Sequence, residues 1–298
     1  MGFYKKILLL GKDGQVGWEL QRALAPLGIL TALNRHECDL ADPAQVQSAL
    51  ERHEPEVIVN AAAYTAVDKA ETEQALAKRI NVDAVAELAL YAREMGSLLV
   101  HYSTDYIFDG SKPEAYVEDD ITNPLSMYGQ TKLDGEHKIR DALCRHLIFR
   151  TSWVFGAHGG NFAKTILRLA QERTTLNVID DQIGAPTSAE LIADVTAHAL
   201  RDVLSGRAPG GTYHLAAAGE TSWYGYAKFV TDHARAKGLS LALTADGLKP
   251  IPATEYPLPA KRPQNSRLNT QLLERSFALK LPSWEAGVTR VLDEWASN

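Results

Sequence analysis

The chain has 298 residues, of which 45% are hydrophobic and 23% charged, and its formal net charge at pH 7 is -6. This composition is typical of a globular protein with one large domain or two modest ones. Because no block of like charges stands out, the charge gives no support to a nucleic-acid or membrane-surface partner.

Short apolar runs alternate with helical patterns through the first half of the chain. The runs are Lys6–Leu10, Ile29–Leu33, Val57–Val59, Leu98–Tyr102 and Leu147–Arg150. This alternation predicts an α/β fold with a Rossmann-like, doubly wound parallel sheet. The apolar start is too short for the core of a signal peptide, and we see no membrane segment. The two cysteines, Cys38 and Cys144, fit no metal spacing or disulfide framework, so we expect a reducing, cytoplasmic location.

A glycine turn follows the first strand directly, in the run Gly11-Lys12-Asp13-Gly14-Gln15-Val16-Gly17. A helical pattern through Trp18 and Leu20 comes next. Strand, glycine turn and helix in this order predict a dinucleotide site, in which the backbone approaches the pyrophosphate and amide groups at the helix start meet its charge. The predicted contacts here are Gly11, Gly14, Gln15, Val16 and Gly17.

The second strand ends at Asn34 and Arg35, where an acidic side chain would hold the adenine ribose and a basic one would accept a 2′-phosphate. The neutral residue followed by arginine favours NADPH, or use of both NADH and NADPH, although Arg35 could be a solvated loop charge. Asp39 and Leu40 are placed to meet the adenine. Asp39 could equally cap the helix that begins near Pro43.

Small side chains follow the third strand, in the run Asn60-Ala61-Ala62-Ala63. They would let a cofactor lie against the backbone, although alanines at a strand end can also simply pack closely. We predict that Ala61, Ala62 and Ala63 contact the cofactor.

The fourth strand ends in Ser103-Thr104, and Tyr128 and Lys132 follow four residues apart on a helix. Residues at this spacing share one helix face, so the ammonium can favour ionisation of the phenol. Such a group can move a proton onto a carbonyl oxygen, so Thr104, Tyr128 and Lys132 are predicted as catalytic residues. The same spacing recurs at Tyr224 and Lys228 after a helix-start signal, and we interpret that second copy as structural.

From about Ser152 the pattern loosens, with strands predicted at Val178–Ile179 and Tyr213–Leu215. We predict a cofactor-binding domain at residues 1–151 and a smaller substrate-binding lobe at residues 152–298, with some segments returning to the sheet. A helix from Ser188 to Leu204 opens with Thr187-Ser188-Ala189-Glu190, a capping-box pattern in which Glu190 bonds back to the cap.

Several of these motifs together resemble the extended short-chain dehydrogenase/reductases, and four of them resemble the dTDP-4-dehydrorhamnose reductase family more narrowly. The four are Ala62–Glu71, His101–Phe108, Arg150–Val154 and Arg262-Pro263-x-Asn265-Ser266. The resemblance covers nearly the whole chain. It implies reduction of the 4-keto group of dTDP-4-dehydro-β-L-rhamnose by NADH or NADPH, which gives dTDP-L-rhamnose in the last step of that sugar nucleotide's biosynthesis.

The resemblance also implies further site residues. Tyr64, Thr65 and Tyr102 join the predicted cofactor contacts, and Lys132 would also hold the nicotinamide ribose. The predicted substrate contacts are Thr104, Asp105, Tyr128, Trp153, Arg262 and Asn265, with Asn161 and Lys164 as weaker candidates. Trp153 could instead be a side chain of the core, and Arg262 could be a solvated charge of a loop.

The expected partner is a small-molecule nucleotide sugar, and a homodimer is possible. No catalytic metal is expected, because a tyrosine acid needs none. A structural divalent cation such as Mg²⁺ at a subunit interface stays open, with Glu19 and Glu190 as the positions to inspect, although capping would explain Glu190 without a metal. Two other functions stay open as well: a nucleotide-sugar epimerase or dehydratase of the same superfamily, and a non-catalytic NAD(P)-binding regulatory subunit.

Overall fold

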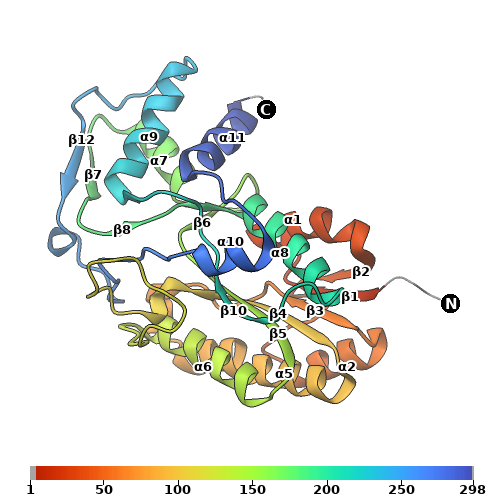
Figure 1. Cartoon of the computed structure of the whole chain (residues 1–298). Coiled ribbons are helices and arrows are strands. Elements are labelled where there is room, and N and C mark those ends of the chain that lie inside the picture. Colours follow the sequence, from red (N-terminus) through yellow and green to blue (C-terminus); the bar gives the residue numbers. More distant parts are fainter. Residues whose placement is uncertain (1–4, 297–298) are drawn as a thin grey trace.

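The computed structural model describes residues 5–296. Six parallel strands form the central sheet in the order β10-β5-β4-β3-β1-β2 (Figure 1). Their bounds are β1 Lys5–Leu10, β2 Gly28–Leu33, β3 Val57–Asn60, β4 Leu98–Thr104, β5 Arg145–Thr151 and β10 Gly211–His214. The strand order reverses beside β1, so the predicted doubly wound parallel sheet is confirmed.

Helices cover both faces of this sheet. One face carries α2 (Pro43–His53), α5 (Ala84–Met95) and α6 (Met127–Asp141), and the other carries α1 (Gln15–Leu24), α8 (Ala189–Leu204) and α10 (Gln271–Phe277). Alternate residues along each strand enter the two cores: Ile7 and Leu9 pack toward α1 and α8, while Leu8 and Leu10 pack toward α2 and α5. This burial on both faces explains why the strands read as continuous apolar runs.

Short helical segments occur in the connections between the longer elements. They are α3 (Val67–Ala70), α4 (Gln74–Lys78), a π-helical turn at Arg79–Asp83, and 3₁₀ turns at Ala25–Leu27, Asp105–Ile107 and Ala253–Glu255. The π-helical turn lies between α4 and α5 and packs against α6.

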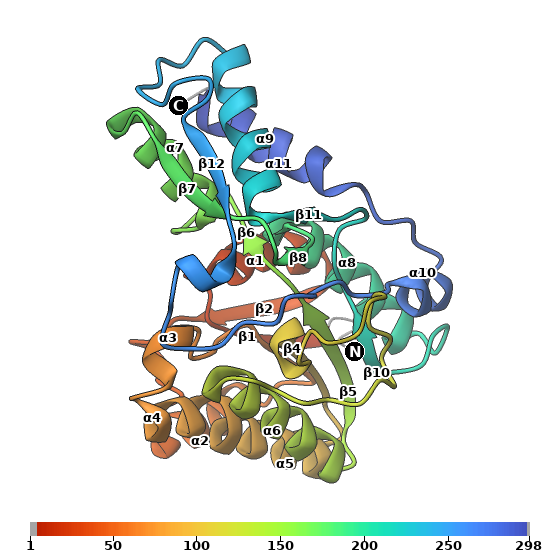
Figure 2. The same ribbon diagram turned by 90° about the vertical axis from the view of Figure 1, so that its left-hand side faces the viewer.

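A smaller lobe stands above the sheet, at the top of Figure 2. Its helices are α7 (Phe162–Glu172), α9 (Trp223–Ala236) and α11 (Trp284–Ala296), and its strands are β7 (Leu176–Ile179) and β12 (Leu248–Ile251). Four two-residue strands complete its links, namely β6 (Val154–Phe155), β8 (Ile183–Gly184), β9 (Thr187–Ser188) and β11 (Thr221–Ser222). This lobe has its own aromatic core, centred on Tyr226 and Trp284.

The smaller lobe agrees with the predicted fold class, whereas the division at residues 151 and 152 stays a prediction. All seven predicted strands are present, and β10 and α8 pack in the layers of the main sheet although they follow residue 151.

The expected capping box at the start of α8 is wrong. Ser188 is the cap, and its hydroxyl accepts a hydrogen bond from the Leu191 amide at 3.2 Å. Thr187 donates instead to the Ala185 carbonyl, and the Glu190 carboxylate pairs with Arg290 at 2.8 Å. Because the cap lies one residue later than the capping-box pattern requires, Glu190 is the second residue of the helix and not the third. Its carboxylate therefore pairs with an arginine of α11.

Candidate functional site

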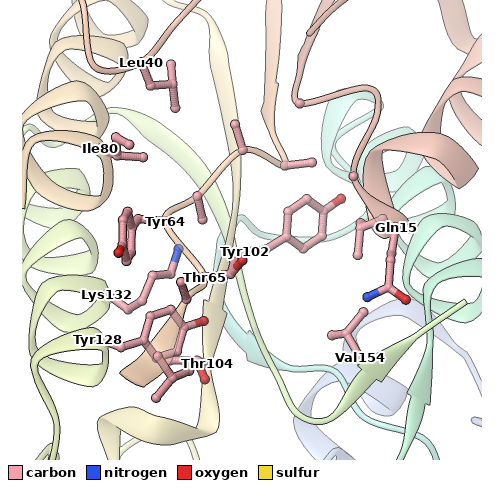
Figure 3. Close-up of a pocket in the computed structure, with 18 of the residues that line it drawn as sticks. Gln15, Leu40, Tyr64, Thr65, Ile80, Tyr102, Thr104, Tyr128, Lys132 and Val154 are labelled. Carbon is pink, nitrogen blue, oxygen red and sulfur yellow. The ribbon is translucent and has the colours of Figure 1, made fainter. Parts of the chain in front are cut away.

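A cavity of about 1030 Å³ opens at the carboxyl ends of the central strands. Most predicted site residues line it (Figure 3). They are Gly11, Gly14, Gln15, Val16, Asn34, Arg35, Asp39, Leu40, Ala61, Ala62, Ala63, Tyr64, Thr65, Tyr102, Thr104, Asp105, Tyr128, Lys132 and Trp153. Gly17, Arg262 and Asn265 are not among the lining residues. The position is the one at which open parallel sheets bind ligands.

The glycine turn is shaped by close backbone contacts. Gly11 has φ of 86°, and a Cβ atom there would lie 2.8 Å from the Ala62 amide nitrogen. A Cβ atom at Gly17 would overlap the Gly11 carbonyl, so this glycine lets α1 pack on the turn. Gly14 has no such conflict, because the nearest atom to its Cβ would be 3.4 Å away. Gly14 lines the cavity at the start of α1, where a pyrophosphate would approach.

The loop after β2 is organised by two ion pairs and by a hydrogen bond from a backbone amide to a carboxylate. Arg35 is largely exposed and pairs with Asp39 at 3.2 Å. The Glu37 carboxylate accepts from the Asn34 amide at 2.8 Å and pairs with Lys12 at 2.6 Å. The alternative that Asp39 caps the next helix is wrong, because Asp42 caps α2 by accepting from the Ala44 amide at 2.9 Å.

Two glycines position the helix that carries Tyr128 and Lys132. A Cβ atom at Gly129 would overlap the Tyr106 carbonyl, and one at Gly135 would overlap the Asn81 carbonyl. Without side chains at these positions, α6 lies directly against the turn after β4 and against the π-helical turn. Tyr128, Thr104 and Lys132 consequently meet at one end of the cavity.

The pKa of Tyr128 differs from expectation. Burial of the hydroxyl raises the pKa of Tyr128 to about 12, the Thr104 hydroxyl acts against that rise, and the Asp105 carboxylate adds to it. The expectation that Lys132 brings this phenol closer to working pH is therefore wrong in this structure. The reason is geometric, because the Lys132 Nζ atom lies 3.2 Å from Nε2 of His101.

Burial shifts two more pKa values at this end of the cavity. It lowers the pKa of Lys132 to about 8, against the opposing charge of Glu136. It raises the pKa of Asp105 to about 6, although Thr104 donates a hydrogen bond to its Oδ1 atom at 3.0 Å. The Thr104 hydroxyl also accepts from the Tyr106 amide at 3.2 Å. Perturbed groups that converge in one cavity are typical of active sites.

Trp153 is held in a strained conformation at the cavity wall. Its φ is 47°, an unusual value for a residue other than glycine. Its ring stacks on Trp223 with centroids 3.6 Å apart and planes 12° apart. A Cβ atom at Gly184 would lie 2.6 Å from the Trp153 ring, so glycine makes room for it. The structure thus presents a flat aromatic surface to the cavity.

Arg262 and Asn265 are engaged within the protein. The Arg262 guanidinium pairs with Asp68 at 2.9 Å, so it is not the solvated loop charge of the alternative interpretation. The Asn265 amide donates to the carbonyls of Lys112 and Glu114 at 2.6 and 2.7 Å and accepts from Arg267. Their predicted contacts with substrate remain predictions.

Asn161 and Lys164 organise a loop beside the glycine turn. Asn161 caps α7 and donates to Gln15 Oε1 at 3.1 Å. Lys164 donates to the carbonyls of Ala157 and Gly159 at 2.5 and 2.8 Å. Since Gly159 lines the cavity, these two residues shape its rim.

Sequence reasoning missed Asn81 and Trp223. The buried Asn81 side chain accepts from the Tyr64 amide at 2.9 Å and donates to the Tyr64 carbonyl and to Thr131 Oγ1, each at 3.1 Å. It therefore fixes the loop after β3 against α6. No local pattern marks Asn81, because its partners lie 17 and 50 residues away in the sequence. Trp223 directly precedes the second tyrosine and lysine pair, and this position in the sequence could have drawn attention to it.

The two positions considered for a cation are paired with arginines. Glu190 pairs with Arg290 and Glu19 lies 3.5 Å from Arg22. Burial and the nearby Glu190 charge raise the pKa of Glu19. Within residues 5–296, no group of three or more histidine, cysteine, aspartate or glutamate side chains could hold a metal ion. In that same range, no helix is both long and apolar enough to cross a membrane.

Comparison with known proteins places the chain in a family. The model of the RmlD substrate binding domain matches residues 5–297. The dTDP-4-dehydrorhamnose reductase of Salmonella typhimurium is 54% identical over 292 residues, which are 97% of each chain.

Two solved structures agree in fold. The dTDP-4-dehydrorhamnose reductase of Bacillus anthracis in complex with NADP superposes with a TM-score of 0.89 and 32% identity, over 98% of this chain and 100% of that one. The Thermus thermophilus UDP-glucose 4-epimerase complex with NAD, at 18% identity and a TM-score of 0.78 over 97% and 98% of the two chains, shares the fold alone. The chain belongs to the RmlD substrate binding domain family, the family that the dTDP-4-dehydrorhamnose reductase motifs of its sequence predicted.

Proposed function

We propose that this protein reduces the 4-keto group of dTDP-4-dehydro-β-L-rhamnose with NADH or NADPH and releases dTDP-L-rhamnose. One observation carries the proposal: Thr104, Tyr128 and Lys132 line the same cavity as the glycine turn that follows β1. A proton donor and a dinucleotide-sized cavity therefore meet at one place. Relatives named for this reaction, at up to 54% identity, support the choice of substrate.

The residues of the cavity fit a nicotinamide dinucleotide. Gly14 and the start of α1 would hold its pyrophosphate, and the loop from Asn34 to Leu40 would hold its adenosine. Ala61, Ala62 and Ala63 offer a backbone surface without bulky side chains. When bound, the cofactor supplies the hydride that reduces C4. Arg35, exposed at the cavity edge, would meet a 2′-phosphate and favours NADPH while still permitting NADH.

Tyr128 serves as the acid. Because its pKa is about 12, the phenol keeps its proton at neutral pH and can give it to the ketone oxygen as that oxygen gains charge. The Thr104 hydroxyl has one hydrogen, which it donates here to Asp105. When a sugar hydroxyl engages Asp105, Thr104 can turn its hydrogen to the ketone oxygen and stabilise the developing charge. Lys132 supplies positive charge beside the reacting groups.

The substrate occupies the side of the cavity formed by the smaller lobe. The stacked rings of Trp153 and Trp223 offer a face for the apolar side of the sugar. Arg262 is a bidentate donor suited to a pyrophosphate, which would compete with Asp68 for it, and Asn265 holds the adjacent loop.

The test is an assay of cofactor consumption with a panel of 4-keto sugar nucleotides. Stoichiometric loss of NADH or NADPH absorbance with dTDP-4-dehydrorhamnose, and dTDP-rhamnose as the product, is the expected result. Conversion of the sugar without net cofactor use would instead identify an epimerase or dehydratase. Cofactor binding without turnover would identify a regulatory subunit.

The cofactor preference has its own test. We expect Arg35→Ala to raise the KM for NADPH about tenfold, the worth of one charge-assisted contact, and to leave the KM for NADH unchanged. Arg93→Ala, an exposed arginine on α5, is the matched control and should alter neither KM. Equal effects of Arg35→Ala on both cofactors would remove the 2′-phosphate contact from the proposal.

Assembly and location are separate parts of the proposal. We infer a cytoplasmic location, because the proposed substrate and cofactor are intracellular metabolites, and we carry the possible homodimer as a separate proposal. Light scattering with and without EDTA tests both the dimer and a structural cation near Glu19 and Glu190. A mass that EDTA leaves unchanged would argue against a cation in the interface.

A further inference from the structure

At the cavity wall, Lys132 is joined to two buried polar side chains, His101 and Asn60, that the proposed chemistry does not use. Asn60 and His101 are direct register partners on β3 and β4, so both side chains point to the face covered by α6. The exposed fractions of Asn60, His101 and Lys132 are 1%, 1% and 2%. Nδ2 of Asn60 lies 3.3 Å from Nδ1 of His101, and Nε2 of His101 lies 3.2 Å from Nζ of Lys132.

The orientation of the Asn60 amide follows from its other contact. The Ala62 amide can only donate, and it lies 3.2 Å from Oδ1 of Asn60. The amide oxygen of Asn60 therefore faces Ala62, and its NH₂ group faces His101. Nδ1 of His101 must then accept a hydrogen bond. A neutral imidazole has one donor and one acceptor, so its hydrogen lies on Nε2 and points at Lys132.

These directions suit Lys132 only when its amine is neutral. A neutral amine can accept the hydrogen bond from His101 Nε2, and the contacts among Asn60, His101 and Lys132 are then all hydrogen bonds. A protonated Lys132 can only donate, so the imidazole hydrogen must lie on Nδ1, where it faces the NH₂ group of Asn60. Either that contact is lost, or the Asn60 amide turns and Ala62 loses its partner. The charged form thus costs one buried hydrogen bond.

We propose that Asn60 and His101 form a positioning relay that fixes the direction of the hydrogen bonds reaching Lys132 and thereby sets how readily this amine holds a proton. The proposal rests on Lys132 acting in the proposed reduction. His101 is neutral throughout, since burial and the Lys132 charge hold its pKa well below the ordinary value. When Lys132 takes up one proton from solvent, the imidazole keeps a single hydrogen, which changes from Nε2 to Nδ1.

Other charged or titratable groups face Lys132 from its surroundings. Glu136 lies one turn along α6 and favours the ammonium form. Tyr64 and Tyr128 flank the lysine side chain on the cavity side (Figure 3), and both phenols are neutral near pH 8 because burial raises their pKa values. None of these three groups is hydrogen-bonded to the Lys132 amine in the described residues, whereas His101 is, and its imidazole can reverse the direction of that bond.

The first test needs no variant and no substrate. Ring ¹⁵N spectra of the wild-type protein, labelled at histidine and recorded from pH 6 to pH 10, report which nitrogen of each ring carries hydrogen. We expect His101 to stay neutral and to exchange its hydrogen between Nδ1 and Nε2 with a midpoint near pH 8, the pKa of Lys132. A ring that keeps one tautomer over this range, or that becomes an imidazolium, would overturn the relay.

His214 is the internal control for this experiment. It is also fully buried, but its Nδ1 atom lies 3.0 Å from the Tyr116 carbonyl, which can only accept. Its hydrogen is therefore fixed on Nδ1, and we expect no tautomer change for His214 across the same titration. Because the spectra do not depend on turnover, they test the relay even if the sugar nucleotide is not the substrate.

The second test is Asn60→Asp, an isosteric change that replaces the donor facing His101 with an acceptor. The imidazole hydrogen should then stay on Nδ1, and Nε2 should accept from a protonated Lys132. We expect the alkaline decline of kcat to move up by about one to two pH units, the equivalent of one buried hydrogen bond. Asn177→Asp makes the same chemical change at an exposed position of β7 and should leave the profile in place.

A carboxylate at position 60 could also act on Lys132 by charge alone, so the double variant Asn60→Asp with His101→Gln separates the two causes. If the relay runs through His101, the upward shift disappears in the double variant. The same shift with and without His101, or no shift in the single variant, would overturn the proposal.

Discussion

The chain contains two tyrosine and lysine pairs at the same spacing, and the surroundings of the two pairs differ. On α6, Tyr128 lines the main cavity and Lys132 is buried against His101. On α9, Tyr224 packs against the aromatic core of the smaller lobe, and Lys228 is exposed and pairs with Asp232 at 2.5 Å. The comparison teaches that the spacing only brings two groups to one helix face, while burial and neighbours decide their chemistry.

Removing the hydroxyl of each of these two tyrosines should give the largest difference between the two pairs. We expect Tyr128→Phe to bind NADPH normally but to lose about 10²–10⁴-fold in kcat, the usual contribution of a general acid. Tyr224→Phe is the matched control and should retain turnover. Fluorescence titration of the cofactor and steady-state assays measure both quantities. Comparable losses in the two variants would mean that α6 has no special role.

Sequence reasoning identified those parts of the site that depend on local patterns. The glycine turn, the strand ends at Ala61 and Thr104, and the helix with Tyr128 each arise from neighbours in sequence, so their spacing predicted their places. Asn81 and the pair of Asn60 with His101 escaped, because their contacts join segments that only the folded sheet brings together.

Two errors in the interpretation of the sequence have the same physical origin. The pattern around Thr187 and Glu190 was compatible with a capping box, but tertiary contacts place the cap at Ser188 and give Glu190 to Arg290. The spacing of Tyr128 and Lys132 predicted an interaction between them. Instead, the Lys132 amine contacts the imidazole of His101, a residue of β4.

The acidic residues one turn beyond the two lysines also differ in burial, and removing the ion pair of each should affect stability differently. Glu136 is fully buried and pairs with Arg150 at 2.9 Å, whereas Asp232 is exposed. We expect Glu136→Gln to lower the free energy of unfolding by about 3 kcal/mol, because it leaves a buried arginine charge without its partner. Asp232→Asn should cause no measurable change, since solvent screens that pair. Urea denaturation of the two variants gives the comparison directly.

The third and smallest effect is the pH dependence of stability. Burial lowers the pKa of Lys132 from 10.5 to about 8, so between these pH values the unfolded chain binds more protons than the folded one. Stability from this residue therefore rises with pH over that window. The free energy of unfolding of the wild type should gain on the order of 2 kcal/mol relative to Lys132→Met between pH 8 and pH 10.

Lys228 should behave in the opposite sense. Its bond to Asp232 raises its pKa, so its stabilisation is complete below the ordinary lysine pKa and is lost only as pH rises through the raised value. The difference between wild type and Lys228→Met should accordingly stay flat from pH 8 to pH 10. Urea titrations at several pH values check both variants, and parallel curves for the two lysines would contradict the difference in burial.

A crystal structure of the protein with NADPH and dTDP-L-rhamnose would test directly whether Tyr128 is the proton donor. We expect the C4 oxygen of the sugar to lie within about 2.6–3.2 Å of the Tyr128 hydroxyl, a hydrogen-bonding distance that permits proton transfer, with Thr104 as its second partner. A complex in which both ligands occupy the cavity but the C4 oxygen lies beyond reach of Tyr128 would contradict it.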